Sequence, residues 1–578
     1  MTVWWERYPW LLDTEKRALE ELGCVWKIDA AAFERGSLRI DCEVDHEGRM
    51  FHMLAEYPGT YPYFPPHVVL LNHEYARHQN PTGKNLCLLA REGRDWEPGN
   101  DTLAGLLKYQ FPVIHAINTL QCHDERVVDE EDRVGEALSS FVPAASGASI
   151  IVPDDIPSSE LTCGQMDVLA RPLDHDFDKS PSINGMVSAI RDRRGTTVVK
   201  AAVKAPAFKE KVAGFWLRLP DRPSSQVARK PKLLVELMSA SVPEFVSALN
   251  RAKAGHVLAL GFVYPDELGW RQTSDDWLFL CIRVQRPAKR SQGAKYQIAF
   301  LSTDWGGPSA LIRRAPALKA LHDKSVFMIG LGSIGSPMAM QLARAGVKNL
   351  DLLDCDSLQV GNTIRWALGW EYAAAHKATA MADHIAAHYP YTQAKPHDMY
   401  IGGPNAVGDA SDYERLRCLA ESSDLIVDAS ANHRVSHFLS DLAKELEIPF
   451  LWLTTTHGAA GGVVGRVIPK QGSGCWQCFQ YALADESIPL PADTGAEEIQ
   501  PGGCSQATFI GAGVDSDEVA ILASRLAVAT LAKHSCSSYP DFLWNVAIGS
   551  FLQDGHSIAP EWKTSTLPIH SRCRQCNP

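Results

Sequence analysis

The chain has no run of 18 apolar residues, the length that a membrane-spanning helix needs, so we expect no membrane segment. Its first residues, MTVWWERYPWLLDTEK, lack the basic stretch and apolar core of a secretory signal peptide. Basic residues are also in deficit, with 56 Lys and Arg against 68 Asp and Glu, a net charge of −12. This balance disfavours a nucleic-acid-binding surface. We expect a cytoplasmic protein that binds neither membranes nor nucleic acid.

Length and composition predict a globular protein of several domains. The chain has 578 residues, of which 45% are hydrophobic and 21% charged, enough for three or four domains. Its 14 cysteines, four of them in metal-type spacing, fit a reducing compartment. We expect an α+β region over 1–140, a middle region over 141–314 and an α/β region over 315–578. The middle region begins with a Ser-, Pro-, Ala- and Gly-rich linker over 140–165 and is β-rich after it.

The most informative segment is a glycine-rich turn between two apolar strands, 326–329 and 350–353. Its glycines are Gly330, Gly332 and Gly335. An amphipathic helix follows the turn, and the second strand ends at Asp354. Such a βαβ unit lets the backbone approach a phosphate at a helix N-terminus, and the acid about 20 positions later suits a ribose hydroxyl. Taken alone, this segment is also typical of an NAD site.

The residues after the second strand favour ATP over NAD. Asp354 is followed by Asp356, then by Asn362 and Arg365, and finally by Lys377. Hydride transfer needs no such group of cations and polar side chains. An attack on ATP does need it, because negative charge develops on the leaving pyrophosphate.

In this order, the residues resemble the ThiF/E1 superfamily of adenylating enzymes, which activate the C-terminal carboxylate of a ubiquitin-like protein as an acyl-adenylate. The resemblance implies a Rossmann-like α/β domain that binds ATP and Mg²⁺, with Asp354 at the ribose. It also implies a catalytic role for Arg365 and Lys377, which contact the phosphates together with Asn362. The nucleotide-binding residues that it implies are Gly330, Gly332, Gly335, Asp354, Asp356, Asn362, Arg365, Lys377 and Asp428.

One position departs from that family. E1-like enzymes usually carry an Asp-x-x-Asp-Asn segment whose second Asp holds Mg²⁺. Here the segment runs from Asp428 to Asn432 and has Ala431 in place of the second acid. Asp428 follows an apolar strand and could reach the metal directly or through water. Alternatively, it only caps the strand end.

Two Cys-x-x-Cys pairs lie late in the chain, 95 positions apart. Their members are Cys475, Cys478, Cys573 and Cys576. Two such knuckles predict a closed, structural Cys₄ zinc site that pins the C-terminal tail. A similar pair of knuckles occurs in many ThiF-like enzymes. The alternative is a pair of disulfides or unrelated thiols.

The N-terminal region carries a second set of signals. Periodicity predicts helices over 13–22 and 101–120 and an antiparallel meander of strands over 38–44, 50–57 and 67–71. A Tyr-Pro…Pro-Pro turn over 57–66 precedes His78-Gln79-Asn80, Cys87 and Trp96-Glu-Pro. This pattern resembles the ubiquitin-conjugating (E2) fold, in which the tripeptide is His-Pro-Asn.

The E2 resemblance assigns roles to three of these residues. Cys87 is the thioester nucleophile, Asn80 stabilises the oxyanion as an amine attacks, and His78 bonds backbone in the loop. Two alternatives stay open. Cys87 between two leucines could be an ordinary buried cysteine, or the E2-like domain could be inactive and serve only for binding.

A third cysteine, Cys504, lies in the glycine-containing segment 501–513, just before an Ala-rich helix. In ThiF-like enzymes a mobile loop crosses the nucleotide site here, and several members carry on it a cysteine that takes the acyl group from the adenylate. Glycines at 502 and 503 would let the loop swing. The alternative is a cysteine without a catalytic role.

The whole order, E2-like region, middle region and E1-like region, resembles the E2–E1 fusion proteins of bacterial CBASS anti-phage operons. The resemblance implies a homodimer that joins the C-terminus of a cGAS-like nucleotidyltransferase to a target lysine through thioesters on Cys504 and then Cys87. Three alternatives remain: a bacterial ubiquitin-like protein as the donor, sulfur-carrier adenylation, and a scaffold with inactive sites.

Overall fold

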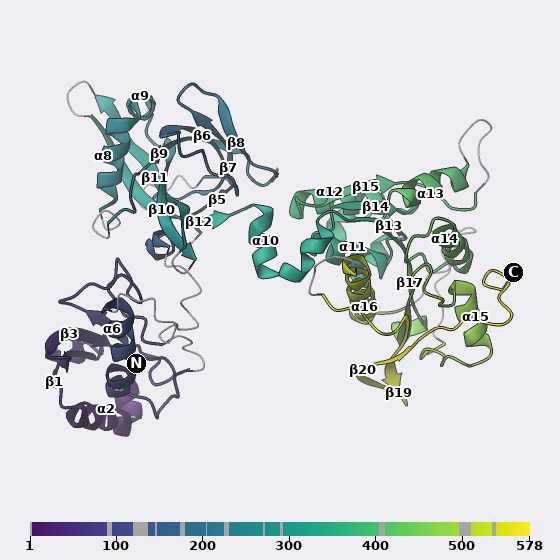
Figure 1. The fold of residues 1–578 in the computed structure, drawn as a ribbon, viewed down its shortest axis with the longest axis horizontal. Helices are drawn as coiled ribbons and strands as arrows, with labels where there is room; N and C mark the ends of the chain where they lie inside the picture. Colours follow the sequence, from purple (N-terminus) through teal and green to yellow (C-terminus); the bar gives the residue numbers. More distant parts are fainter. Residues whose placement is uncertain are drawn as a thin grey trace. The chain divides into compact units, whose positions relative to one another are not determined.

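The computed structural model divides the chain into two compact units (Figure 1). The first comprises Met1–Ala201 and Phe208–Gly306, and the second comprises Gly307–Pro578 with the segment Ala202–Ala207. The residues that the structure describes are 3–89, 95–119, 137–144, 147–173, 180–203, 205–224, 230–269, 272–289, 293–403, 411–495, 510–533 and 539–577.

The first unit begins with what we call the N-terminal subdomain, residues 3–119. Its antiparallel sheet has the order β1-β2-β3-β4. The strands are β1 (Val25–Ile28), β2 (Arg39–His46), β3 (Arg49–Glu56) and β4 (His67–Leu70). The helices are α1 (Trp4–Arg7), α2 (Pro9–Leu22), α3 (Ala30–Glu34), α5 (Leu103–Gly105), η1 (Leu106–Gln110) and α6 (Phe111–Thr119). The predicted meander and both predicted helices are confirmed, and β1 was missed.

Along β2, residues with buried side chains alternate with less buried ones, and the buried ones form part of the core of this subdomain. Ile40, Cys42 and Val44 are buried, and they pack in one cluster with Leu19 of α2 and Phe111 of α6. Residues two apart on a strand share a face, so one face of the sheet is covered by helices.

A buried carboxylate joins two loops of this core. Both carboxylate oxygens of Glu15 lie within hydrogen-bond distance of the Leu103 N–H, at 3.1 and 3.3 Å, and one accepts the Tyr61 hydroxyl at 2.6 Å. The side chain therefore ties the 57–66 turn to the start of α5. Burial raises the pKa of Glu15 from its usual 4.5 to about 7.

The middle region forms what we call the barrel subdomain, residues 147–305. Its strands are β5 (Ser149–Val152), β6 (Cys163–Ala170), β7 (Asn184–Asp192), β8 (Thr197–Lys200), β9 (Glu210–Arg218), β10 (Val257–Gly269), β11 (Gln272–Lys289) and β12 (Gly293–Trp305). Their order is β5-β12-β11-β10-β9-β6-β7-β8, and β5 pairs with β7 as well as β12. Seven strands therefore close into a barrel, which leaves β8 at the side of β7. A closed barrel has no exposed sheet edge.

The predicted linker over 140–165 is partly wrong, because β5 lies inside it and closes the barrel. Ile150 and Val152 are buried, whereas their neighbours in the strand are half-buried, which is the alternation of a strand with one buried face. Because the residues around this short strand are rich in Ser and Gly, the sequence pattern indicated a linker instead of a strand. The predicted β-rich character of the region that follows is confirmed.

Two apolar clusters hold the barrel subdomain together. One includes Trp216, Trp277 and Phe279. The other packs alternate residues of β10 and β11 against α8 (Pro231–Ser241) and α9 (Pro243–Arg251). Among the described helices, none is alone long and apolar enough for a membrane span, and only the bent pair α8–α9 passes that test, by length and composition.

Polar contacts join the barrel subdomain to the N-terminal subdomain and to the segment between them. Arg77 forms an ion pair with Glu267 of β10. The Leu138 N–H donates to Asp266 at 2.7 Å and the Ser139 hydroxyl donates to Asp276 at 2.6 Å, so the turn η4 (Leu138–Phe141) is held against β10 and β11. These partners are largely buried, which strengthens charged contacts relative to exposed ones.

The second unit is built on an eight-stranded sheet with the order β15-β14-β13-β16-β17-β18-β19-β20. Its first five strands in this order are parallel, and the last three are antiparallel. The strands are β13 (Ser325–Ile329), β14 (Asn349–Leu353), β15 (Gln393–His397), β16 (Leu425–Asp428), β17 (Phe450–Thr455), β18 (Gly461–Val467), β19 (Val546–Gln553) and β20 (His556–Ser565).

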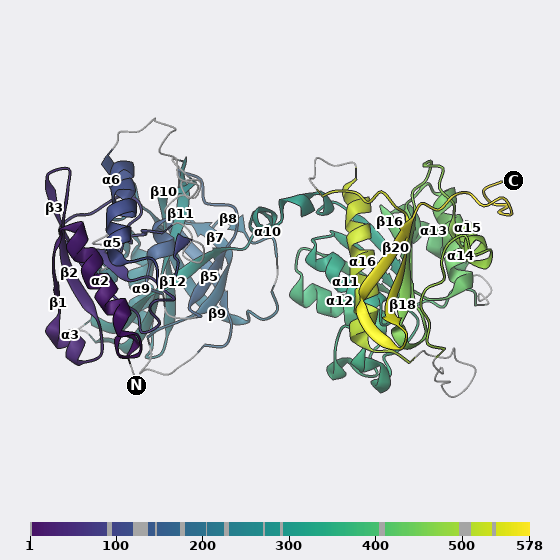
Figure 2. The ribbon, with the colours of Figure 1, turned by 90° about the horizontal axis from the view of Figure 1, so that it is seen from below.

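Helices cover both faces of this sheet, as in doubly wound α/β domains. On one face lie α11 (Gly335–Arg344), α12 (Lys377–His388) and α16 (Gly513–Ala532), the last of which runs along the sheet in Figure 2. On the other face lie α13 (Asp412–Glu421), α14 (His433–Glu445) and α15 (Trp476–Ala484). The remaining helical segments of the unit are α10 (Pro308–Arg314), η5 (Pro316–Leu321), η6 (Val360–Ile364), η7 (Trp370–Tyr372) and η8 (His457–Ala459).

We predict that Glu15 makes the first unit less stable as the pH rises. The folded state holds the Glu15 proton up to a pH of about 7, whereas the unfolded chain releases it near 4.5. Protonated Glu15 therefore makes its full contribution to the free energy of unfolding below pH 4.5. This contribution, up to about 3 kcal/mol, is lost as the pH rises through 7.

Glu15→Gln keeps an oxygen for the Leu103 N–H but does not titrate. Urea unfolding at pH 5 and pH 8 should show that the wild type loses stability relative to this variant at the higher pH. Equal pH dependence in the two proteins would contradict the assignment.

Candidate functional site

The glycine-rich turn follows β13, which lies between β14 and β16 in the sheet. At this point the strand order reverses, and in open α/β sheets ligands bind at the carboxyl ends of the strands there. Gly330 has a φ of 85°, and a Cβ on it would lie 2.6 Å from the Ser430 nitrogen. A Cβ on Gly335 would lie 2.0 Å from the Gly330 carbonyl oxygen. These two glycines therefore let the turn pack against the end of β16.

Gly332 differs from its two neighbours in the motif. A Cβ on Gly332 would meet nothing within 4 Å, so it faces open space just before α11 begins. Helix α11 has no side-chain cap at its N-terminus. Backbone N–H groups at such a terminus favour an anion. The turn therefore fits the phosphates of ATP.

Asp354, at the end of β14, organises the turn. It is 8% exposed, and its carboxylate oxygens accept the Leu331 N–H at 2.7 Å and the Asp356 N–H at 2.8 Å. The buried Lys377, first residue of α12, places its Nζ 2.8 Å from Asp356 and 3.9 Å from Asp354. The structure thus brings the predicted acids and the predicted lysine to one end of the sheet.

Arg365 and Asn362 are held against the same turn. The Arg365 Nη2 donates to the Asn362 Oδ1 at 2.8 Å. The next residue, Trp366, donates its indole N–H to the Leu331 carbonyl at 2.6 Å, and the Ala367 N–H donates to Ser336 at 3.1 Å. Burial lowers the pKa of Arg365, a sign that its cation sits in a medium of reduced polarity, where charge attraction is stronger.

Asp428 ends β16 opposite Ile329 and is 2% exposed. Its carboxylate accepts the Ser430 N–H at 3.0 Å, and burial raises its pKa. This geometry caps the strand end. Mg²⁺ coordination by Asp428 stays a prediction, and the raised pKa adds a cost of ionisation that a nearby cation would offset.

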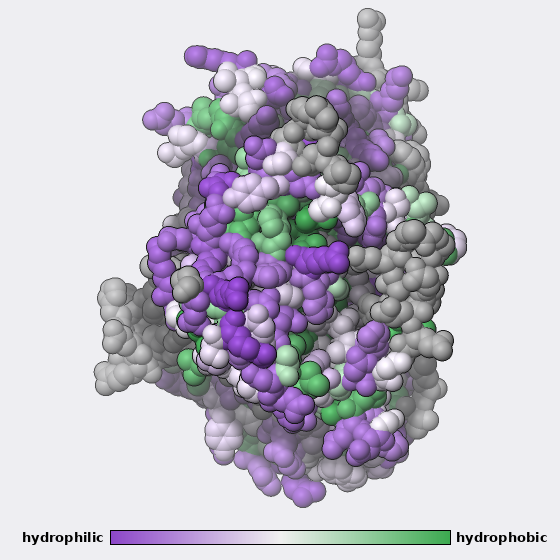
Figure 3. All heavy atoms as spheres, turned by 90° about the vertical axis from the view of Figure 1, so that its right-hand side faces the viewer, coloured by the Kyte–Doolittle hydropathy of each residue, from purple (hydrophilic) through white to green (hydrophobic). Residues whose placement is uncertain are grey.

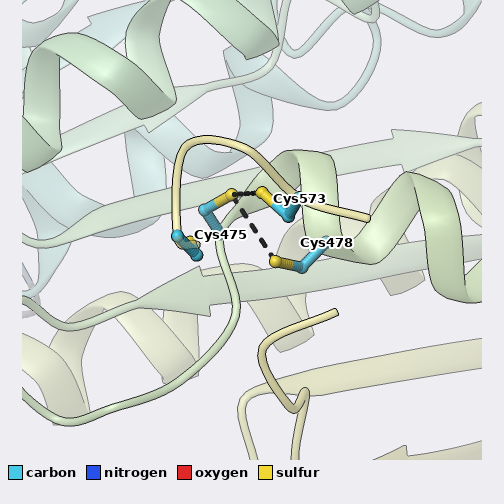
Figure 4. Close-up of side chains that lie close together, drawn as sticks. Cys475, Cys478 and Cys573 are labelled. Atoms are coloured by element: carbon cyan, nitrogen blue, oxygen red, sulfur yellow. Dashed lines mark hydrogen bonds between the residues drawn. The ribbon is translucent and has the colours of Figure 1, made fainter. Parts of the chain in front are cut away.

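The four predicted cysteine ligands converge at the C-terminus. Cys475 precedes α15, Cys478 lies in its first turn, and Cys573 and Cys576 come from the tail after β20. The Cys475 sulfur lies 3.8 Å from that of Cys478 and 3.6 Å from that of Cys573. Dashed lines mark both contacts in Figure 4. A tetrahedral zinc ion with Zn–S bonds of about 2.3 Å separates its sulfurs by about 3.8 Å. The cluster therefore fits Zn²⁺.

Cys87 is exposed, which removes the alternative of an ordinary buried cysteine. Its N–H donates to the His78 carbonyl at 2.8 Å, and Gln79 pairs with Leu86 in the same hairpin. His78 is buried, and its backbone carbonyl accepts this bond. The predicted contact of its side chain with backbone stays a prediction. The hairpin therefore sets Cys87 opposite the His78–Asn80 tripeptide.

The Asn80 side chain has a fixed orientation. Its Oδ1 accepts the N–H groups of Thr82 and Gly83 at 2.9 and 2.8 Å, and the Thr82 hydroxyl lies 2.8 Å away. With the oxygen bound in the turn, the NH₂ end remains as the donor that an oxyanion would need.

Gln79 explains why a residue other than proline fits the middle of this tripeptide. Its side chain is 4% exposed, accepts the Tyr75 N–H at 2.6 Å and donates to the Lys84 carbonyl at 3.2 Å. It therefore bridges both arms of the hairpin. Sequence reasoning missed this role, and it also missed Trp366, whose signal was a large aromatic directly after Arg365.

Cys504 lies outside the described residues. Its flanks are described: Thr494 bonds the His457 carbonyl at 3.1 Å, and the chain resumes at Ile510. At Gly513, a Cβ would lie 3.1 Å from the Arg365 Cα. The described chain after this segment therefore passes beside Arg365 at Gly513.

Several apolar side chains in the segments around Arg365 and Gly513 are exposed. Those of η6, η7 and the start of α16 are Val360, Ile364, Trp370 and Val514, which are 51%, 79%, 70% and 78% exposed. Apolar patches among polar side chains are also seen on the face drawn in Figure 3. Exposed apolar patches of this kind are common at protein–protein contacts.

The sequence is related to known proteins along its whole length. Residues 309–561 match the sequence model of the ThiF family. The uncharacterized protein y4oA of Sinorhizobium fredii (strain NBRC 101917 / NGR234) is 27% identical over 99% of this chain and 97% of its own length.

Two further matches are partial. The ATP-dependent ubiquitin transferase-like protein Cap2 of Enterobacter hormaechei subsp. hoffmannii (strain UCI 50) is 26% identical over 42% of this chain and 40% of Cap2. The crystal structure of E. coli MccB with succinimide aligns with a TM-score of 0.33 and 15% identity over 44% of this chain and 68% of MccB. From the family match and the geometry of the turn, the second unit is a ThiF/E1-like adenylation domain.

Proposed function

We propose that the chain is an ATP-dependent protein-conjugating enzyme. It adenylates the C-terminal carboxylate of a partner protein, carries the acyl group on Cys504 and then Cys87, and forms an amide with a target lysine. The observation that carries this proposal is the presence, in one chain, of an adenylation domain and an exposed Cys87 opposite a fixed Asn80.

The first step joins the carboxylate to AMP. A carboxylate oxygen attacks the α-phosphorus of ATP, the bond to the β-phosphate oxygen breaks, and pyrophosphate leaves. Arg365 and Lys377 carry the positive charge that stabilises the phosphates as this bond breaks. The open space at Gly332 admits the phosphates, and Asp354 holds the ribose. Adenylation uses Mg²⁺, which neutralises phosphate charge, and Asp428 is the candidate ligand.

The next steps move the acyl group between sulfurs. The Cys504 thiolate attacks the acyl carbon and releases AMP, and the Cys87 thiolate then takes the acyl group and releases the Cys504 thiolate. A lysine amine finally attacks the Cys87 thioester, loses a proton to solvent, expels the Cys87 thiolate and yields an amide. Asn80 donates to the oxyanion of this last step. Each thioester keeps the acyl group activated, so one ATP suffices.

We propose a cGAS-like nucleotidyltransferase as the carboxyl donor, in anti-phage defence, and a homodimer through the second unit. The similarity to Cap2, a ubiquitin transferase-like protein, supports a protein substrate. The exposed side chains of Ile364 and Val514, whose segments meet at Gly513 beside Arg365, support protein contacts near the proposed nucleotide site. A donor that is instead a ubiquitin-like or sulfur-carrier protein would use the same adenylation chemistry.

Arg365→Ala should reduce ATP–pyrophosphate exchange by about 100-fold or more with the cognate donor present, because a positioned cation is lost from the phosphates. Arg344→Ala removes an exposed arginine at the end of α11 and serves as the control, with exchange unchanged. Wild-type exchange in the Arg365 variant would refute the assigned role.

The Cys₄ cluster should hold one Zn²⁺ per chain. Elemental analysis after dialysis should find it in the wild type and in Cys418→Ser, which removes an exposed cysteine elsewhere, but not in Cys573→Ser. Hydrogen exchange should show the tail from Leu567 to Asn577 opening first in that variant, since metal binding is coupled to folding. A zinc-free wild-type protein would rule the metal out.

The two catalytic cysteines should act in series. Cys504→Ala should stop all thioester formation but leave adenylation intact. Cys87→Ala should let the thioester on Cys504 accumulate without amide product, and Cys87→Ser should trap a slower-reacting oxyester. Gels with and without reductant separate these species, and Cys418→Ala serves as the control.

One outcome would change the order of transfer. If Cys504→Ala conjugates at the wild-type rate, the acyl group passes straight from the adenylate to Cys87, and Cys504 has no catalytic role.

A further inference from the structure

Three metal-binding side chains converge in the N-terminal subdomain, far in sequence from the Cys₄ cluster. His46 ends β2, Glu47 follows in the β2–β3 turn with a φ of 54°, and His115 lies on α6. One donor atom from each lies within 4.8 Å of the others. The rings of His46 and His115 stand at 87° with their centroids 5.0 Å apart. The proposed conjugation chemistry uses none of the three.

A hydrogen bond orients the buried member of this cluster. His115 is 6% exposed, and its Nδ1 lies 2.7 Å from the Tyr75 hydroxyl. Its Nε2 therefore faces the other two residues and lies 3.8 Å from the Glu47 Oε2. Histidines that bind metals are usually fixed in this way, with one ring nitrogen on a hydrogen-bond partner and the other on the ion.

The spacing suits a small cation. Nitrogen and oxygen ligands lie about 2.0–2.2 Å from zinc, so that two tetrahedral ligands lie roughly 3.4 Å apart. The observed 3.8 Å is close to this value. The Glu47 side chain is 73% exposed and can close the difference without disturbing the core.

The one nearby cation in the turn, Arg49, is engaged elsewhere among the described residues. Its Nη2 lies 2.9 Å from the His73 Nδ1, and its guanidinium lies over the Phe51 ring at 5.4 Å. Neither of these two Arg49 contacts involves Glu47. The Glu47 carboxylate therefore keeps its negative charge for the cluster.

We propose that His46, Glu47 and His115 form a second metal site, for a divalent transition-metal cation such as Zn²⁺, with a water as the fourth ligand. Two imidazoles and one carboxylate suit zinc, nickel or copper, whereas Mg²⁺ and Ca²⁺ prefer ligands that are all oxygen. This site does not depend on the proposed conjugation.

The bound ion would join the β2–β3 turn to α6. From His115, a chain of contacts leads through Tyr75 to Gln79, which accepts the Tyr75 N–H at 2.6 Å and bonds the Lys84 carbonyl. Gln79 lies in the hairpin that carries Cys87. Metal binding is therefore expected to stabilise the first unit and this hairpin with it.

Zinc titration of the full-length protein, after dialysis that leaves the Cys₄ cluster loaded, tests the site. Calorimetry should show one further zinc equivalent in the wild type. His46→Ala should abolish this binding, and Glu47→Gln should weaken it about 10-fold or more. His52→Ala is the matched control, because His52 also lies near a carboxylate, 3.4 Å from Glu43, but has no third ligand in the described cluster.

His115 is buried, so its replacement could disturb folding, and the test therefore uses the more accessible His46 and Glu47. As a second readout, Zn²⁺ should raise the melting temperature of the wild type and of His52→Ala, but not of His46→Ala, while Mg²⁺ should raise none of them. Equal zinc binding by the wild type and His46→Ala, or no binding to the wild type beyond the Cys₄ ion, would overturn the proposal.

Discussion

The geometry of the proposed nucleotide site depends on the buried carboxylate of Asp354. One of its oxygens accepts the Leu331 N–H inside the glycine turn, and the other accepts the Asp356 N–H. It therefore fixes the turn after β13 relative to the segment after β14. Trp366, the residue after Arg365, donates its indole N–H to the Leu331 carbonyl and so ties the Arg365 segment to the same turn. Both the N–H and the carbonyl of Leu331 are therefore hydrogen-bonded. The open position at Gly332, the next residue, is thus fixed relative to the charged side chains of Asp354 and Arg365. Such preorganisation is what makes fixed charges effective in catalysis.

Much of this site could be predicted from the sequence, because its chemistry is local. The spacing of Gly330, Gly332 and Gly335 after an apolar strand predicts a turn at a helix N-terminus, and the structure contains that turn. The convergence of the four cysteines followed from two knuckles. The E2-like assignment rested on a short motif, and the exposed Cys87 and fixed Asn80 agree with its chemistry.

Other features could not be predicted, because they depend on contacts between distant segments. Closure of the barrel requires β5 to pair with both β7 and β12, and no local pattern encodes that pairing. The roles of Gln79 and Trp366 depend on backbone groups that only the fold brings near. His46 and His115 are 69 positions apart, so the sequence could not predict that their side chains lie close together.

In the proposed reaction, the C-terminal acyl group of the partner protein is activated as an adenylate and then reaches Cys87 as a thioester. The most direct measurement is to mix enzyme, donor protein and ATP, quench in acid, digest, and locate the donor's C-terminal residue by mass spectrometry. We expect a hydroxylamine-labile link to the peptide that contains Cys87. A donor found only as free adenylate, or joined to other cysteines and never to Cys87, would contradict it.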